Sequence, residues 1–306
     1  MIANRVAYGQ MVHTLAKEDP RIVIVDSDFA NCANYFDFME DFPERFFQVG
    51  IAEQNMVSVA AGLATCGLIP FVASFSVFSS MRALDQVRNQ VCYNSLNVKV
   101  VGTHAGLETG EDGGTHQSVE DVAIMRAVPD IKVLAPSTPN MTASLTRLMA
   151  ESFGPCYMRM GRANLPELYE EGEVFLFGGS RTLREGDDVC IAAYSNMVHV
   201  ALKAADMLAE KGIKARVIDA YCIKPLDDKA ILDAAKTTAG IVTVEDHNII
   251  GGLGGAVSEL LCREYPAKVR FVGIEDKFGR SGTIPDLFNS YGLTAEKVVE
   301  KALELL

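Results

Sequence analysis

Two places in this 306-residue sequence carry side chains suited to acid–base chemistry, and the first is Glu53. It stands in GIAEQNMVSVAAGLA (residues 50–64), directly before an almost wholly apolar run. That run predicts a helix buried on most sides, and a carboxylate at its start is costly in free energy unless a partner stabilises it. The residues alone leave two interpretations open: a catalytic carboxyl group, or a favourable interaction with the helix dipole worth ~0.3–1 kcal/mol.

The second place is the glycine-rich stretch THAGLETGEDGGTHQSVED (residues 103–121), which contains His104 and His116. It follows the β-branched run NVKVV, so we expect it to leave the carboxyl end of a strand, where open α/β sheets bind ligands. Glycine lets a backbone approach a ligand closely, and histidine can exchange a proton near neutral pH. The composition alone also fits a solvated loop that binds nothing.

The elements that must position these side chains alternate between short β-branched runs and helical patterns, which is typical of parallel α/β layers. In the first half we expect strands at residues 21–26, 68–74, 97–103, 131–136 and 155–160, and helices at 4–18, 53–66, 78–93, 118–127 and 139–152. In the second half we expect strands at 188–195, 213–220, 240–246 and 267–274, and helices at 197–211, 227–237 and 254–264. The predicted fold class is α/β, with two parallel-sheet α/β domains.

An acidic, glycine-bearing stretch, LPELYEEGEVFLFGGSRTLREGDD, separates the two halves. Its single apolar run at residues 174–177 predicts one short strand within a linker. We therefore expect a first domain at residues 1–165, a linker at 166–186 and a second domain at 187–306.

Composition argues against several classes of partner and of binding site. The formal net charge of −12 disfavours nucleic acid and anionic membrane surfaces, because both attract basic proteins. No apolar run approaches the roughly 20 residues that span a bilayer. The seven cysteines are scattered without a CxxC pair, so we expect reduced thiols, no cysteine-bound metal and a cytoplasmic location.

Three motifs together closely resemble the transketolase family of thiamine-diphosphate enzymes: GIAEQNM, FSVFSSMRALDQVR and GEDGGTHQ. The resemblance extends over essentially the whole chain. It covers the family's pyrimidine-binding domain and then its C-terminal domain, with VEDHNIIGGLGG and EDKFGRSG in the second half. The motifs occur in the family's order, which makes a chance match improbable.

The resemblance implies a cofactor-binding role for several residues. Glu53 matches the glutamate that hydrogen-bonds the aminopyrimidine ring of thiamine diphosphate and shares a proton with it, which favours the catalytic interpretation. Phe75 and Phe78 match aromatic residues that pack on that ring, whereas Met81 stands where a third aromatic residue is expected. Asp28 resembles an aspartate near the cofactor.

Further matches imply a substrate site. His116 corresponds to a catalytic histidine that contacts the reacting oxygens of the donor, and Asp112 to a residue that recognises the hydroxyl beside the carbonyl. His104, Arg162 and Arg5 resemble residues that hold a sugar phosphate, for which the planar donor fork of arginine is well suited. For each arginine alone, a surface salt bridge is the alternative.

One part of the family's site is missing from this sequence. The family holds the cofactor's diphosphate through Mg²⁺ with a GDG motif and a downstream asparagine, and no GDG occurs here. The resemblance therefore implies the C-terminal subunit of a split two-chain transketolase, with thiamine diphosphate bound jointly and Mg²⁺ held by an N-terminal subunit. We expect an α2β2 heterotetramer that uses sugar phosphates in pentose phosphate metabolism. We expect this chain to contribute no metal ligand.

Three alternatives stay open. A deoxyxylulose-phosphate synthase-like enzyme would share the AEQ string and a DGxTHQ loop, although the paired His104 and His116 favour transketolase. The β-subunit of a 2-oxoacid dehydrogenase has a similar length and domain order, but GEDGGTHQ argues against it. A regulatory or assembly subunit that kept the fold would have no need to retain Glu53, Asp112 and His116 together.

Overall fold

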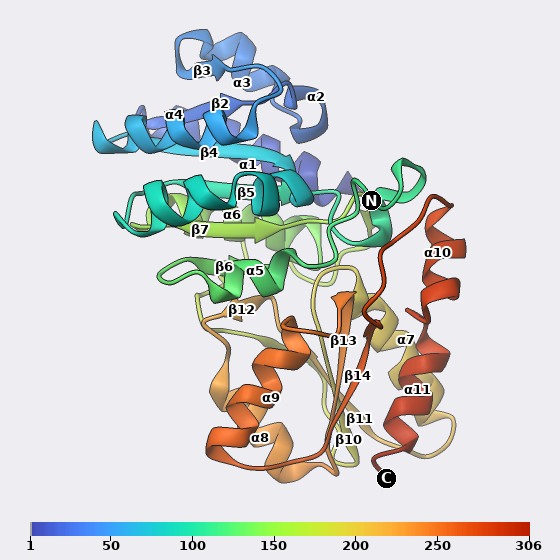
Figure 1. The fold of residues 1–306 in the computed structure, drawn as a ribbon. Coiled ribbons are helices and arrows are strands. Elements are labelled where there is room, and N and C mark those ends of the chain that lie inside the picture. The colour runs from blue at the N-terminus through green and yellow to red at the C-terminus, as the bar shows by residue number, and fades with distance from the viewer. Residues whose placement is uncertain (1) are drawn as a thin grey trace.

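The structure, a computed structural model, describes residues 2–306 and contains two α/β layers, one above the other in Figure 1. Each layer is a largely parallel sheet with helices on both faces, so the predicted fold class is confirmed. Both faces of such sheets are covered, which is why their strands read as continuous apolar runs such as IVIVD and VCIAA.

The first sheet has seven strands in the order β12-β6-β7-β5-β4-β2-β3, and six of them are parallel. Their bounds are β2 Ile22–Asp26, β3 Phe46–Gln48, β4 Ile69–Phe75, β5 Lys99–Thr103, β6 Lys132–Leu134, β7 Cys156–Arg159 and β12 Cys222–Lys224. The helices of this half are α1 Asn4–Glu18, α2 Ala30–Ala33, α3 Phe36–Asp41, α4 Glu53–Thr65, α5 Asp121–Ala127 and α6 Pro139–Glu151. Two apolar clusters cover the sheet, one against α4 and one against α1 and α6.

The second sheet has five strands in the order β14-β13-β10-β11-β9, with only β9 antiparallel. Its strands are β9 Arg181–Arg184, β10 Val189–Ala193, β11 Ala215–Asp219, β13 Ile241–Asn248 and β14 Val269–Ile274. Its helices are α7 Met197–Ala209, α8 Asp228–Thr237, α9 Leu253–Glu264, α10 Ile284–Tyr291 and α11 Ala295–Leu303. In Figure 1, α8 and α9 lie on one side of this sheet and α7 and α11 on the other.

The two halves are joined by shared strand pairing. Strand β12 comes from the second half of the chain, yet it pairs antiparallel with β6 at the edge of the first sheet. Within the first half, a two-residue strand, β1 (Ile2–Ala3), pairs antiparallel with β8 (Asn164–Leu165). The two antiparallel strands, β9 and β12, are short edge strands whose direction depends on neighbours distant in sequence.

Two local predictions are wrong, and two helices lie where the sequence patterns indicated none. Residues 174–177 form no strand in the described chain, because the backbone of Leu176 bonds the hydroxyl of Tyr221 and Phe175 packs between two tyrosine rings. The helix predicted at 78–93 is two wider π-helical segments, η2 (Phe78–Arg82) and η3 (Gln86–Cys92). Helices α10 and α11 were not predicted, although Thr283 and Thr294 cap their starts with side-chain oxygens.

Short 3₁₀ turns complete the chain at η1 (Pro43–Arg45) and η4 (Leu107–Asp112). Within residues 2–306, no helix is both long and apolar enough to cross a membrane.

Candidate active site

Glu53 is the first residue of α4, and its carboxylate is buried with only 3% of its surface exposed. Two partners hold it: Arg82 Nη1 donates to Oε2 at 2.9 Å, and Ser74 Oγ donates to Oε1 at 3.4 Å. Arg82 also lies over the ring of Phe78 at 4.0 Å from its centroid, and its own side chain is 46% exposed. The partner of this buried carboxylate is therefore a cation whose side chain is about half exposed.

An aromatic cluster (Phe29, Phe75, Phe78, His104 and His116) stands at the carboxyl end of β4 and β5. The Phe75 ring is 4.7 Å from the His104 ring and 5.6 Å from the His116 ring, between centroids. Phe78 and His116 are 5.2 Å apart and nearly perpendicular. The structure thus brings together two phenylalanines and two histidines that the sequence placed in separate motifs.

His104 begins the loop after β5 and has a left-handed backbone, with φ of 53°. Such a conformation costs free energy in a residue other than glycine and occurs often at functional sites. Thr109 Oγ1 donates to its carbonyl at 2.6 Å and so supports this geometry. Burial is the main cause that lowers the pKa of His104 to about 4, and the nearby cations of Arg162 and Arg5 contribute to this lowering. The imidazole is therefore neutral at physiological pH.

Arg5 and Arg162 come from opposite ends of the first half but converge near His104. Arg5 Nη1 donates to the Cys32 carbonyl at 3.1 Å, and Arg162 Nη1 donates to the Thr109 carbonyl at 3.1 Å. Burial raises the pKa of the Cys32 thiol, both arginines oppose that rise, and the carboxylate of Asp112 adds to it. These groups therefore surround one small region that carries two cations and one exposed carboxylate.

Asp28 lies on the loop after β2 with an exposed side chain and φ of 66°. Its backbone N–H donates to Gln48 Oε1 at 3.1 Å, and the N–H of Gly50 donates to the same oxygen at 2.8 Å. Gln48 Nε2 in turn donates to Asp26 Oδ2 at 2.7 Å. One glutamine therefore connects the Asp28 loop to the segment that leads into Glu53.

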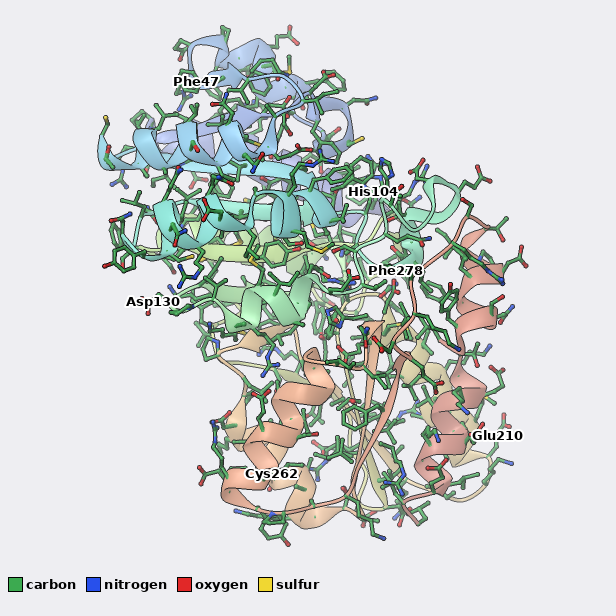
Figure 2. The ribbon with its side chains drawn as sticks, viewed as in Figure 1. Phe47, His104, Asp130, Glu210, Cys262 and Phe278 are labelled. Atoms are coloured by element: carbon green, nitrogen blue, oxygen red, sulfur yellow. The ribbon has the colours of Figure 1, made fainter. Side chains whose placement is uncertain are left out.

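The loop that carries both histidines is fixed by the second half of the chain. The N–H of Leu107 donates to both carboxylate oxygens of Asp246, at 3.0 and 3.1 Å. Gln117 Nε2 donates to the carbonyl of Arg280 at 3.0 Å. Figure 2 shows His104 and Phe278 at this junction, where the loop meets the C-terminal segment.

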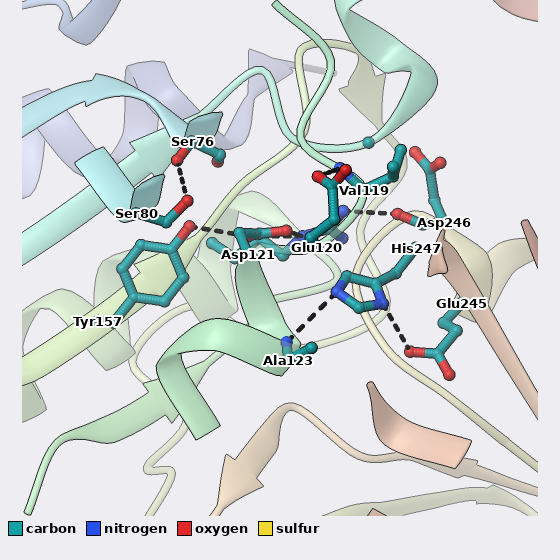
Figure 3. A network of polar contacts seen from close by, with 12 residues as sticks. Ser76, Ser80, Val119, Glu120, Asp121, Ala123, Tyr157, Glu245, Asp246 and His247 are labelled. Atoms are coloured by element: carbon teal, nitrogen blue, oxygen red, sulfur yellow. Dashed lines mark hydrogen bonds and ion pairs between the residues drawn. The ribbon is translucent and has the colours of Figure 1, made fainter. Parts of the chain in front are cut away.

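A buried polar network continues beneath the loop (Figure 3). Arg159 Nε donates to Asp121 at 3.1 Å, Tyr157 donates to the same carboxylate at 2.7 Å, and Arg159 Nη2 donates to the Asp246 carbonyl. The N–H of Ala123 lies 3.3 Å from His247 Nε2, so this nitrogen accepts. His247 therefore has a structural role between the two halves.

Sequence reasoning did not identify Arg82, Gln48, Asp246 or Glu108. Arg82 could have been found, because it lies four residues after Phe78, and that spacing brings two side chains together on a helical turn. The other three act through hydrogen bonds between residues far apart in the chain, which no local pattern reveals.

The described residues suit one end of thiamine diphosphate. Phe75 and Phe78 offer flat apolar surface, and Arg82 contacts both the Phe78 ring and the Glu53 carboxylate, so an apolar face and a carboxyl group suited to an aminopyrimidine ring lie in one region. Residues 2–306 contain no group of three or more histidine, cysteine, aspartate or glutamate side chains arranged to hold a metal ion. Phe75, Phe78 and Glu53 therefore fit the pyrimidine end of the cofactor, and we assign no residue of this chain to its diphosphate.

Comparison with known proteins gives a consistent result. The family model for the transketolase pyrimidine-binding domain matches residues 1–167, and the model for the transketolase C-terminal domain matches residues 178–298. A putative transketolase C-terminal section from Methanocaldococcus jannaschii is 44% identical, over 98% of this chain and 95% of that protein. One of the subunits of an apulose-4-phosphate transketolase, from Phocaeicola vulgatus, is 39% identical, over 100% of this chain and 98% of its own length.

Solved structures agree with these relatives. A split gene transketolase, described as an inactive β4 tetramer, has a TM-score of 0.91 and 43% identity and covers 100% of this chain and 98% of its own. A transketolase from Pichia stipitis has a TM-score of 0.84 and 26% identity, and this chain corresponds to 46% of its length. With both domain models matched in order, the chain belongs to the transketolase family of thiamine-diphosphate-dependent proteins and corresponds to its C-terminal section.

Proposed function

We propose that this chain is the C-terminal subunit of a two-chain transketolase that moves a two-carbon ketol unit from a ketose phosphate to an aldose acceptor. The observation that carries the proposal is the arrangement of Phe75, Phe78, His104 and His116 at the carboxyl end of β4 and β5, with Arg82 linking Phe78 to the buried Glu53. Those residues suit the pyrimidine ring of the cofactor and a polar substrate beside it.

In this proposal Glu53 binds the pyrimidine ring and shares a proton with its ring nitrogen, while Phe75 and Phe78 pack on the ring face. Arg82 would give up its contact with Glu53 Oε2 and with Phe78 as the ring enters, and its exposed side chain has room to do so. When bound, thiamine diphosphate supplies a nucleophilic carbon and an electron sink. Asp28 would lie near the cofactor without binding its diphosphate.

His116 and Asp112 would contact the reacting end of the donor, and Arg5, His104 and Arg162 its anionic end. The neutral state of His104 lets one ring nitrogen donate a hydrogen bond without a third positive charge beside the two arginines. Two relatives support an anionic sugar, since their names specify apulose-4-phosphate and 6-deoxy-6-sulfo-D-fructose. The second is 41% identical over 98% of this chain.

The partner in this proposal is an N-terminal subunit that carries a GDG motif and holds Mg²⁺ and the diphosphate, in an α2β2 assembly. Its support is the absence of GDG from this sequence, together with relatives of nearly equal length that are named as subunits or sections. The seven cysteines are all free thiols, which supports a cytoplasmic location.

A second candidate is a 1-deoxy-D-xylulose-5-phosphate synthase activity. A synthase of that name from Desulforudis audaxviator is 39% identical over 96% of this chain and 47% of the synthase. The paired His104 and His116 next to two arginines favour ketol transfer between sugars, because they provide contacts for a polyhydroxylated phosphate.

The test is reconstitution. The purified chain is mixed with a GDG-bearing N-terminal subunit, thiamine diphosphate and Mg²⁺, and two products are assayed: the transferred ketose and 1-deoxy-D-xylulose 5-phosphate. We expect ketol transfer only in the mixture. Formation of the deoxyxylulose product would select the second candidate, and full activity of the partner alone would make this chain a regulatory subunit.

A further inference from the structure

Glu108 is a buried carboxylate that the proposed reaction does not use directly. It lies in the turn η4, between His104 and Asp112, and only 2% of its surface is exposed. Burial of a carboxylate is costly in free energy unless its oxygens accept hydrogen bonds. The structure supplies three such bonds, so the question is what they hold in place.

Two of the three bonds come from consecutive backbone groups. Arg162 N–H and Ala163 N–H donate to Glu108 Oε2 at 2.7 and 3.0 Å. The close approach depends on Gly161, where an added Cβ would lie 2.0 Å from the same oxygen. Glu108 therefore fixes the backbone of the segment from which the Arg162 side chain projects.

The side chain of Arg162 returns to the same turn. Its Nη1 donates to the carbonyl of Thr109, and Thr109 Oγ1 donates to the carbonyl of His104. Both ends of Arg162, its backbone and its guanidinium, are thus attached to residues 108 and 109. Through Thr109, this arrangement connects the guanidinium of Arg162 to the backbone of His104.

The third bond comes from the second half of the chain. Asn196 Nδ2 donates to Glu108 Oε1 at 2.8 Å, and Asn196 directly precedes α7. The carboxylate thus lies between a segment after β7 of the first sheet and a segment after β10 of the second. Each oxygen has a defined set of donors, which leaves the side chain one orientation.

We propose that Glu108 is a positioning residue that fixes Arg162 for the anionic group of the sugar, with Asn196 fixing Glu108. The inference rests on the proposed function, because it takes that anionic group as the ligand of Arg162. Glu108 itself acts only through the backbone of residues 162 and 163. The consequence is that loss of Glu108 weakens recognition of the anion and leaves the chemistry at the other end of the sugar unchanged.

The test compares Glu108→Ala and Glu108→Gln in the reconstituted enzyme, with a phosphorylated donor and its unphosphorylated analogue. We expect Glu108→Ala to raise KM for the phosphorylated donor by about tenfold, with kcat and the analogue's kcat/KM changed less than about twofold. Glu108→Gln keeps an oxygen for both N–H groups, and Asn196 can turn its amide to accept from the new NH₂. We therefore expect Glu108→Gln to restore KM to within about threefold of wild type.

The matched control is Glu245, another buried glutamate that accepts two consecutive backbone N–H bonds, from Leu253 and Gly254, at the start of α9. Glu245→Ala should change the KM values for the phosphorylated and the unphosphorylated sugar equally. If Glu108→Ala does not fold, Asn196→Ala carries the same test, with an expected phosphate-selective rise in KM of about threefold. An equal effect on both sugars, or no effect in either variant, overturns the inference.

A binding measurement separates this inference from the proposed function. Calorimetric titration of the chain with inorganic phosphate needs no turnover, and we expect Glu108→Ala to weaken that binding as Arg162→Ala does. Reconstituted protein without ketol transfer, but with this loss of phosphate binding, would refute the function and keep the inference. If the reconstituted enzyme performs ketol transfer but Glu108→Ala binds phosphate as well as the wild type does, the proposed function is kept and the inference about Glu108 is refuted.

Discussion

Glu53 and Arg82 illustrate how single residues set the chemistry of this site. The Glu53 side chain is only 3% exposed, and a guanidinium nitrogen of Arg82 donates a hydrogen bond to it at 2.9 Å, so the buried carboxyl group has a partner. The same guanidinium covers the face of Phe78. Because Arg82 is nearly half exposed, it can be replaced by another hydrogen-bond donor at a modest cost in free energy.

The first prediction concerns the proton of Glu53. Glu53→Gln keeps the size and one oxygen but removes the group that can share a proton with a bound ring. Loss of one charge-assisted hydrogen bond, ~1.5–3 kcal/mol, lowers kcat by about tenfold to a hundredfold, and loss of proton exchange adds to this. Steady-state kinetics of the reconstituted enzyme measure this loss in kcat, and Glu44→Gln, at an exposed glutamate, is the control. Near-normal turnover would remove Glu53 from catalysis.

The second prediction concerns the charge of the substrate. Arg162→Ala should raise KM for a phosphorylated sugar far more than for its unphosphorylated analogue, because the lost contact matters only when phosphate is present. Arg147→Ala provides the control, since Arg147 pairs with Glu18 between α1 and α6. An equal rise for both sugars would show that Arg162 does not contact the phosphate.

At the scale of elements, the loop after β5 is shaped by groups beneath it. The ion pair of Arg159 and Asp121 connects β7 to the start of α5, and Arg159 also reaches the backbone of β13 (Figure 3). Both side chains are almost completely buried. Neither helix propensity nor strand propensity accounts for the position of the loop, which instead depends on this network.

The third prediction is the cost of breaking that pair. Asp121→Asn leaves the buried Arg159 without its counter-charge, which should lower the free energy of unfolding by about 3–5 kcal/mol. Glu259→Gln breaks an ion pair with Arg126 in which the glutamate is 63% exposed, and should cost no more than ~1 kcal/mol. Urea unfolding of both variants measures the difference. Equal losses in the free energy of unfolding would show that the buried Arg159–Asp121 pair stabilises the fold no more than the exposed pair does.

The fourth prediction is a pH dependence at the junction of three segments. Asp219 at the end of β11 accepts hydrogen bonds from Ser137 and Tyr169, and burial raises its pKa from 3.8 to about 7, although those bonds oppose the rise. The folded state therefore binds the proton more tightly than the unfolded state. Its contribution to stability is fully present below pH ~4 and is lost as the pH rises to about 7.

Asp219→Asn removes this titration. As the pH rises from ~4 to ~7, the free energy of unfolding of the wild type should fall relative to that of the variant, by at most ~1.4 kcal/mol per pH unit. The difference between the two should then stay constant above pH 7. Denaturant unfolding at several pH values measures this, and a constant difference across the window would contradict the raised pKa of Asp219.

At the scale of the whole molecule, the two layers form one connected body. Strand β12 of the second half completes the first sheet, and Asp246 and Asn196 of the second half bond the loop that carries the proposed substrate residues. The second half therefore contributes to the site through positioning, although the proposed cofactor and substrate contacts all come from the first half.

The fifth prediction is dependence on a partner. Glu53, Phe75 and Phe78 can bind only the pyrimidine end of thiamine diphosphate, while the diphosphate would meet a chain of formal net charge −12. Calorimetric titration of the lone chain with thiamine diphosphate and Mg²⁺ should show weak binding or none. With the GDG-bearing partner present, binding should become stoichiometric and the cofactor should raise Tm, because it binds only the assembled site. Tight binding to the lone chain would end the two-chain proposal.

The sequence by itself determined the class of fold and the places where chemistry was to be sought. Buried strands such as β2 and β10 are continuous apolar runs, and α4 begins at the Glu53 where its apolar pattern begins, because burial and helical period act on neighbouring residues. The motifs containing Glu53, Phe75 and His116 were likewise visible as local strings, and the family to which they pointed is confirmed.

Only the tertiary structure decided which partner each polar group has. Arg82 lies 29 residues from Glu53, Asn196 lies 88 residues from Glu108, and Asp246 lies 139 residues from Leu107. The edge strand β12 and the π-helical segments after β4 also depend on neighbours that are distant in sequence or on side chains that compete for backbone groups. Sequence periodicity reports which face of an element is buried, but a single hydrogen bond between two loops leaves no periodic trace.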